Sequence, residues 1–264
     1  MSHGLFEEKV KLTEEHRYFD GDGKEYLGFS KLYDLICKPF DKESISGFVA
    51  KAQGKTKEDV LAEWDGKRDN GSRIDDAITL YNQTNLIADE NNDVKDLILS
   101  VLAEYKRYKK NISQLIVYNE NYKCAGMSDN AFLFSFMKDS AFGMSDIKCF
   151  DDVLNTDGTI KHFSYDTLFV RRGWLNAPFN HLPATKYTKI CFQLSYYAHL
   201  LEELTGRKCN ELFIHLIHPV KHTHQKIYLP YLKNDVKLLL ETYKPQIDLL
   251  LAKKTVVEET NEAF

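Results

Sequence analysis

Two aspartates and a lysine in the middle of the chain have the types and spacing of a metal-assisted hydrolytic site. Asp129 ends the glycine-containing segment 124–129, and Asp146, Ile147 and Lys148 begin 17 positions later. Residues two apart on a strand point to the same face, so Asp146 and Lys148 share one side. Hard divalent cations prefer carboxylate oxygens and water, and Ile147 adds a backbone carbonyl. The pattern predicts that Asp129, Asp146 and Ile147 hold one or two Mg²⁺ or Mn²⁺ ions.

Lys148 supplies a positive charge next to the predicted metal ligands. An ammonium beside a metal-bound water can orient the nucleophile, help to deprotonate it and offset charge that grows on a phosphate. Asp129, Asp146 and Lys148 together therefore fit hydrolysis of a phosphodiester bond. The alternative is that Asp-x-Lys is a surface tripeptide on an edge strand with no chemical role.

The elements around these residues follow from the spacing of apolar residues. Aromatic and β-branched residues between polar turns predict neighbouring strands over residues 114–118, 123–136 and 142–150, and a later strand over 211–220. Helical spacing predicts helices over residues 73–86, 93–105, 187–204 and 230–251. Asp93 caps the second of these helices, and Gly206 ends the third.

The N-terminal third has its own elements. Residues 12–29 predict two short strands around a turn, and Ser30 caps the helix that follows. Ser44 and Thr56 cap two further short helices, which end near Trp64. We expect a single domain over residues 1–252 and a polar, disordered tail over 253–264.

Composition excludes several classes of protein. The chain has 264 residues, 43% hydrophobic and 28% charged, which is typical of a globular protein. Its apolar runs are too short for a membrane span, so we expect a cytoplasmic protein with no membrane partner. The five cysteines form no C-x-x-C pair, which predicts free thiols. A net charge of -4 leaves nucleic acid open as a partner, because a nuclease needs only a local basic track.

A family resemblance comes from the order of three motifs. They are Ala125-Gly126-x-x-Asp129, Asp146-x-Lys148 and Gln193-x-x-x-Tyr197. This order resembles the RecB-like and phage recombination exonuclease (YqaJ/lambda-type) branch of the PD-(D/E)XK nuclease superfamily. The opening of the chain is similar too, in His16-Arg17-Tyr18-Phe19, Lys38-Pro39-Phe40 and Gly71-Ser72-Arg73-Ile74-Asp75. The likeness covers about residues 12–217.

The resemblance implies a fold and roles for further residues. The fold is α/β, a central mixed β-sheet flanked by helices (a restriction-endonuclease-like core) with a helical N-terminal portion. Gln193 supports the catalytic residues, and Asp75 is a further metal ligand. Substrate-binding roles fall to Ser72, Arg73, Lys189 and Tyr197.

The chain departs from the family pattern at two positions. Asp75 stands where the branch usually has histidine, and a carboxylate there favours Mg²⁺ or Mn²⁺. The other interpretation is that Asp75, like Asp76, only solvates an exposed helix turn. Gln114 stands where relatives often carry glutamate. The cysteine cluster of iron–sulfur members is missing, so no iron–sulfur cluster is expected.

The resemblance implies a metal-dependent DNA nuclease, an exonuclease in recombination, repair or replication, with a phage gene as one source. Its partners would be single- or double-stranded DNA and a single-strand-annealing or replication protein. Two alternatives stay open, a structure-specific endonuclease and a nucleic-acid-binding protein that has lost catalysis.

Histidines gather near the last predicted strand, at His215, His218, His222 and His224. They run from the strand into a loop without cysteine support, so the sequence predicts no zinc site. Residues 221–226 fit a phosphate-contacting loop, or an ordinary polar hairpin.

Overall fold

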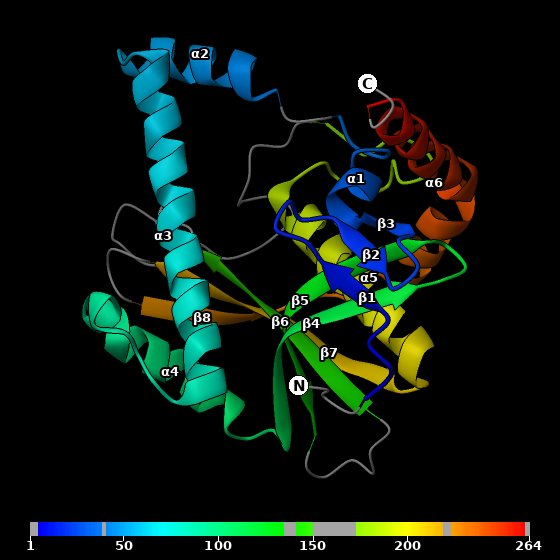
Figure 1. Ribbon diagram of the computed structural model, residues 1–264. Coiled ribbons are helices and arrows are strands. Elements are labelled where there is room, and N and C mark those ends of the chain that lie inside the picture. The colour runs from blue at the N-terminus through cyan, green and yellow to red at the C-terminus, as the bar shows by residue number, and fades with distance from the viewer. Residues whose placement is uncertain (1–4, 39–40, 135–140, 150–172, 219–222, 262–264) are drawn as a thin grey trace.

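The computed structural model describes residues 5–38, 41–134, 141–149, 173–218 and 223–261. An eight-stranded sheet runs through the middle of the molecule (Figure 1). Its strands are β1 (Val10–Leu12), β2 (Tyr18–Asp20), β3 (Glu25–Gly28), β4 (Lys110–Asn119), β5 (Cys124–Leu133), β6 (Ala141–Cys149), β7 (Lys208–His218) and β8 (Thr223–Tyr228). The helices are α1 (Phe29–Tyr33), α2 (Lys42–Gln53), α3 (Lys57–Thr84), the 3-10 helix η1 (Asp89–Val94), α4 (Lys95–Tyr105), α5 (Lys186–Thr205) and α6 (Lys233–Asn261).

The sheet is mixed, which confirms the predicted α/β fold. The strand order is β1-β2-β3-β5-β6-β7-β8, and β4 pairs with β5 off this path. β3 is parallel to β5 and β6 is parallel to β7, while the other pairs are antiparallel. The three central strands predicted from residue type correspond to β4, β5 and β6. Their predicted ends at residues 136 and 150 lie outside the described residues.

Helices cover both faces of the sheet. On one face, residues of α1, α5 and α6 form the larger apolar cluster with residues of the sheet. On the other face, α3 and α4 form a second cluster with side chains such as Phe132, Ile147 and Phe213. Figure 1 shows α3 standing along one side of the molecule with α2 across its end.

The long helix α3 corrects the prediction for the N-terminal third. Thr56 caps it as predicted, in a capping box with Asp59. The helix then continues past Trp64 through Gly66 and Gly71 to Thr84, where the sequence predicts a break between two helices. The glycines lower helix propensity without forbidding helix, and packing of the later turns against the sheet decides the outcome.

Three predicted caps are wrong. Ser30 lies inside α1, whose N-cap is Gly28, and Asp41 rather than Ser44 caps α2. Asp93 lies in η1, and the N-cap of α4 is Val94. The Asp93 carboxylate instead forms an ion pair with Arg73 on α3.

The C-terminal half agrees better with the sequence. Thr185 caps α5, and Gly206 ends it in the left-handed conformation at φ 67°. Helix α6 continues to Asn261, past Lys253, where the sequence predicts the tail to begin. Within the described part of the chain, no helix combines the length and apolar character that a membrane span needs.

Candidate active site

An interruption in the pairing of β5 creates the place where the predicted site residues meet. β4 pairs along β5, so β3 and β6 share the other edge. β3 pairs with β5 only as far as Ala125, and β6 pairs from Asn130 onward. Among the described strands, none pairs with residues 126–129 on this edge. Asp129 therefore lies where the sheet forks, beside an open stretch of backbone.

The β4 side of Asp129 is also irregular. Pairing between β4 and β5 passes from Ser113 to Leu115 and skips Gln114, which has a positive φ of 52°. The continued register places Gln114 opposite Asp129. Gln114 itself is exposed, and the β4–β5 ladder is locally broken at this position.

Asp129, Asp146 and Lys148 are brought together at the fork. The antiparallel register Asn130↔Ser145, continued by one residue, places Asp146 opposite Asp129. The backbone N–H of Ile147 donates to Asp129 Oδ2 at 3.2 Å. Lys148 Nζ lies 2.5 Å from Asp146 Oδ2, and only 3% of Asp146 is exposed. The carbonyl of Ile147 stays a predicted ligand.

Helix α3 brings Asp75 to the same group. A Cβ placed on Gly71 would lie 3.4 Å from Cys149 Cβ, so α3 passes close to the end of β6. One turn later, Asp75 carries a buried Oδ1 that has no hydrogen-bond partner among the described residues. Burial, and then the charge of Asp146, raise the pKa of Asp75 to about 6. Asp75 is thus part of the acidic group, whereas Asp76 is exposed.

The electrostatics of the group are those of neighbouring carboxylates that are partly or fully buried. Burial and the charge of Asp146 raise the pKa of Asp129 well above its usual value. Burial opposes ionisation of Asp146, but the Lys148 charge and the hydrogen bonds of Asp146 with Asp129, Lys148 and the Ile147 backbone together lower the Asp146 pKa. Burial alone would lower the pKa of Lys148, yet the two aspartates raise it. The Asp146–Lys148 ion pair is therefore favoured, and a second negative charge at Asp129 is disfavoured.

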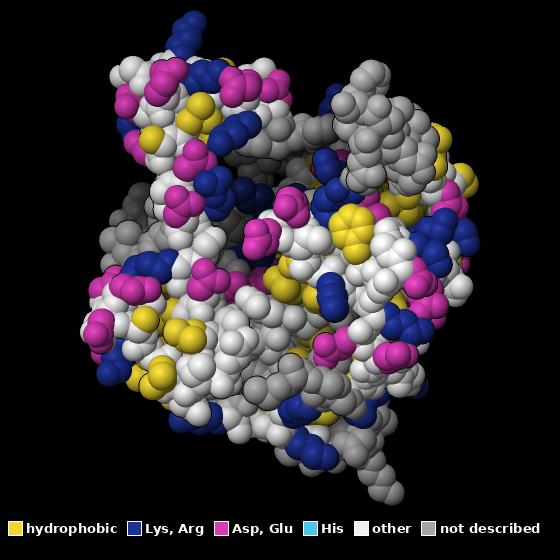
Figure 2. Space-filling view, in the orientation of Figure 1, with side chains coloured by type: hydrophobic (Ala, Val, Ile, Leu, Met, Phe, Trp, Pro, Cys, Tyr) yellow, Lys and Arg dark blue, Asp and Glu magenta, His cyan; other side chains and the backbone are white. Residues whose placement is uncertain are grey.

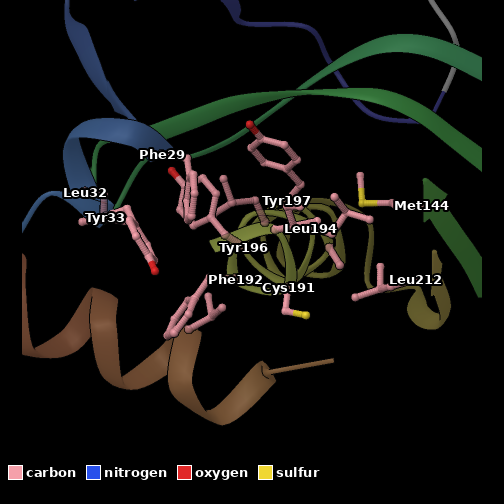
Figure 3. Packing of buried hydrophobic residues seen from close by; sticks show 14 of the residues in the cluster. Phe29, Leu32, Tyr33, Met144, Cys191, Phe192, Leu194, Tyr196, Tyr197 and Leu212 are labelled. Atoms are coloured by element: carbon pink, nitrogen blue, oxygen red, sulfur yellow. The ribbon is translucent and has the colours of Figure 1, made fainter. Parts of the chain in front are cut away.

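Gln193 and Tyr197 lie on the face of α5 that looks toward the fork. Gln193 Nε2 donates to Tyr197 Oη at 2.9 Å, and Tyr197 is 7% exposed. Figure 3 shows Tyr197 pointing from α5 toward the strands, while Phe192 points to the opposite side. Burial raises the pKa of Tyr197, and the charges of Asp146 and Asp129 add to this shift. Both predicted residues therefore line the surroundings of the acidic group.

The other predicted substrate-binding residues have different neighbours. Arg73 donates to both carboxylate oxygens of Asp93, at 2.9 and 3.0 Å, and to the Glu90 carbonyl. Ser72 and Arg73 line an open depression of about 480 Å³ between α3 and η1. Lys189 is exposed, with Nζ 5.6 Å from the centre of the Tyr33 ring.

The acidic group fits a hard divalent cation. Asp75, Asp129 and Asp146 offer carboxylate oxygens from α3, β5 and β6, and a bound cation would satisfy the orphaned Oδ1 of Asp75. Burial and then the charge of Asp146 raise the pKa values of Asp75 and Asp129, and a bound cation would oppose both effects. Asp75, Asp129 and Asp146 are the residues that would hold Mg²⁺ or Mn²⁺.

The sequence groups His215 with His224 and predicts no zinc site, and it gives no sign that Glu104 joins them. Glu104 lies with His215 and His224, although Glu104 precedes His215 by 111 positions. Local spacing does not reveal ligands that come from a helix and a distant hairpin. The signal that the sequence did offer is His215, a histidine at an inward-facing position of an otherwise hydrophobic strand.

Comparison with known proteins assigns no family. No protein-family model matches the chain, and no curated protein matches it. Any function for this chain is therefore inferred from its residues and their geometry.

Proposed function

We propose that this chain is a metal-dependent DNA nuclease that hydrolyses phosphodiester bonds. The observation that supports it most is the meeting of Asp75, Asp129, Asp146 and Lys148 at the fork of the sheet, with Lys148 2.5 Å from Asp146. These residues come from three elements, and they place one buried carboxylate, Asp146, near two half-buried ones. Placing like charges close together away from water costs free energy. Proteins retain such an unfavourable arrangement where it serves binding or chemistry.

Each residue has a distinct part in the proposed reaction. Bound Mg²⁺ or Mn²⁺ would supply Lewis acidity and a water of lowered pKa. Asp75, Asp129 and Asp146 would hold the cation, and the Ile147 N–H donates to the Asp129 carboxylate and fixes its position. Lys148 orients the attacking water and offsets charge on the phosphate. Gln193, bonded to Tyr197, supports the wall of the site on the α5 side.

The molecular surface supports a nucleic-acid substrate. Figure 2 shows the molecule hollowed between the α2 end of α3 and the body that carries α1 and α6. Lys and Arg side chains gather on the walls of this hollow, together with acidic ones. A local basic track can bind phosphates in a chain whose net charge is -4.

The choice of an exonuclease in recombination, repair or replication rests on the order of motifs. A single-strand-annealing or replication protein is the corresponding proposed partner, and single- or double-stranded DNA the substrate. The same core serves endonucleases, because the shape of the substrate channel separates the two activities. A binding protein without catalysis would not need Lys148 beside Asp146.

The test uses end-labelled linear DNA and covalently closed circular DNA with Mg²⁺ or Mn²⁺. Asp146→Asn and Lys148→Met remove one ligand and the ammonium while keeping side-chain size. Asp76→Asn is the matched control, since Asp76 is exposed and adjacent to Asp75. We expect the wild type and the control to degrade linear DNA, and both site variants to lose roughly 10²- to 10⁴-fold in rate.

Mn²⁺ binding separates the two site variants. Asp146→Asn should weaken Mn²⁺ binding, whereas Lys148→Met should keep it, because removing a nearby positive charge favours a cation. Cleavage of closed circles would favour the endonuclease. No cleavage by the wild type with either metal would overturn the nuclease proposal and leave the binding protein.

A further inference from the structure

A second group of ligand-type side chains lies on the opposite face of the sheet from Asp146. It consists of Glu104 on α4, His215 on β7 and His224 on β8, with one ligand atom from each all within 4.8 Å of one another. His215 pairs with Ile147 and shares its face, whereas Asp146 points the other way. The two groups are therefore separate sites.

The β7–β8 hairpin places the two histidines together. Its register pairs Ile217 with His224 and His215 with Lys226, so the histidines are diagonal neighbours on one face. Their ring centres are 5.3 Å apart. Helix α4 packs against β8 and brings Glu104 to the same point (Figure 1).

His215 is the observation that points to a ligand. It is fully buried, at 0% exposure, and neither ring nitrogen has a hydrogen-bond partner among the described residues. The Nδ1 atom of His224 is also buried without a partner in the described part of the chain. The rings of Tyr105 and Phe213 stand edge-on to His215 at 5.4 and 5.3 Å, so its walls are aromatic. A buried imidazole without partners is unfavourable unless something else bonds to it.

We propose that Glu104, His215 and His224 bind a transition-metal ion, with Zn²⁺ as the best match. Two imidazole nitrogens and one carboxylate oxygen are ligands that Zn²⁺ uses, with a fourth position for water. Imidazole favours Zn²⁺ over Mg²⁺, so this site and the carboxylate site select different metals.

A bound metal ion would have to displace the neighbouring positive charge of Lys226. Lys226 Nζ lies 3.7 Å from Glu104 Oε2 and 3.7 Å from the centre of the Phe213 ring. Metal binding at Glu104 displaces this ion pair, and Lys226 keeps its aromatic contacts and the Tyr108 hydroxyl at 3.4 Å. Burial, His224, Lys226 and Arg107 together lower the pKa of His215 to about 3. His215 is thus neutral, which is the form that binds metal.

The bound ion would cross-link the β7–β8 hairpin to helix α4. His215 and His224 hold two adjacent strands, and Glu104 holds α4, so one bound ion joins three elements. Metal that binds only the folded state stabilises it by mass action. The site is therefore structural, and it does not depend on the proposed nuclease activity.

The test measures Co²⁺ and Zn²⁺ binding by the full chain carrying Asp146→Asn, which weakens the carboxylate site. After removal of metal with a chelator, Co²⁺ reports imidazole ligation by its visible absorption, and Zn²⁺ competes it away. His224→Gln and Glu104→Gln change partly exposed ligands, so the chain should still fold. His181→Gln is the matched control, because His181 pairs with Asp235 away from the cluster.

We expect one equivalent of Co²⁺ with visible absorption in the parent and in the control. Each ligand variant should bind at least about 100-fold more weakly. Zn²⁺ should raise the melting temperature of the parent and leave the ligand variants unchanged. Absence of the Co²⁺ absorption, or an equal signal in His224→Gln, would overturn the proposal. Nuclease activity takes no part in either readout.

Discussion

Gly126 and Tyr197 are packed so closely that a Cβ on residue 126 would lie 2.2 Å from the Tyr197 ring. The glycine that precedes Asp129 therefore leaves room for the tyrosine of α5, and the two motifs form one packing unit. Tyr197 accepts the amide hydrogen of Gln193, so the same contact sets the position of both α5 residues. Glycine is required here because a larger side chain would clash with the Tyr197 ring. Backbone conformation is not the reason, since Gly126 is not among the glycines with positive φ.

Gly126→Ala should destabilise the protein by about 1–3 kcal/mol, because the added methyl forces the Tyr197 ring out of its place. The measurement is chemical denaturation of the variant and the wild type in chelator. Combining it with Tyr197→Leu, which replaces the ring by a smaller side chain, should recover part of this loss. A double-mutant interaction energy near zero would contradict the contact.

Ionisation of Asp75 should lower the stability of the metal-free protein as the pH rises. Its pKa is raised to about 6 in the fold, so the folded state binds more protons than the unfolded state between the two pKa values. Stability from this group is present below the unfolded value of 3.8 and is lost as the pH rises through about 6. Asp75→Asn should therefore raise the melting temperature at about pH 8 in chelator, with little effect near pH 4.

The control for this pH dependence is Asp76→Asn, which changes the adjacent exposed carboxylate. It should leave the difference between the two pH values unchanged. Added Mn²⁺ should stabilise the wild type more than Asp75→Asn, because the variant lacks one predicted ligand. An Asp75→Asn variant that is less stable than the wild type at about pH 8 in chelator would show that the carboxylate is not crowded.

We expect Arg73 to stabilise the packing of η1 against α3 and not to bind substrate. Its guanidinium bonds both oxygens of Asp93, and the two side chains are 34% and 53% exposed. Arg73→Ala should cost up to about 1 kcal/mol of stability, as exposed ion pairs do. Asp93→Ala should cost a similar amount, and the double variant should cost no more than either. A large loss of DNA affinity in Arg73→Ala but not in Asp93→Ala would instead restore Arg73 as a phosphate contact.

Sequence reasoning succeeded where one local signal decides the outcome. Aromatic and β-branched residues marked β4 to β6, and strand alternation placed Asp146 and Lys148 on one face. The predictions were wrong where contacts between residues far apart in the sequence determine the structure. The Asp93 carboxylate has the chemistry of a cap, but Arg73 from another helix binds it. Glu104 meets His215 only after the sheet and α4 have packed together.

The same limit explains the missed continuity of α3. Gly66 and Gly71 have low helix propensity, and the sequence offered no way to weigh this against burial of Ile74, Ala77 and Ile78 on the sheet. That burial stabilises the later turns, and the capping box at Thr56 starts the earlier ones. Between them the helix passes through Gly66 with helical geometry.

This continuity predicts that Gly66→Ala stabilises the protein by about 0.5–1 kcal/mol, the difference in helix propensity between the two residues. A Cβ at Gly66 meets nothing within 4 Å, so no contact opposes the gain. The matched control is Gly54→Ala, where a Cβ also meets open space but φ is 66°, a left-handed conformation that alanine disfavours. Chemical denaturation should give opposite signs for the two substitutions. Destabilisation by Gly66→Ala as well would mean that the chain breaks between Trp64 and Arg73, as the glycines alone suggest.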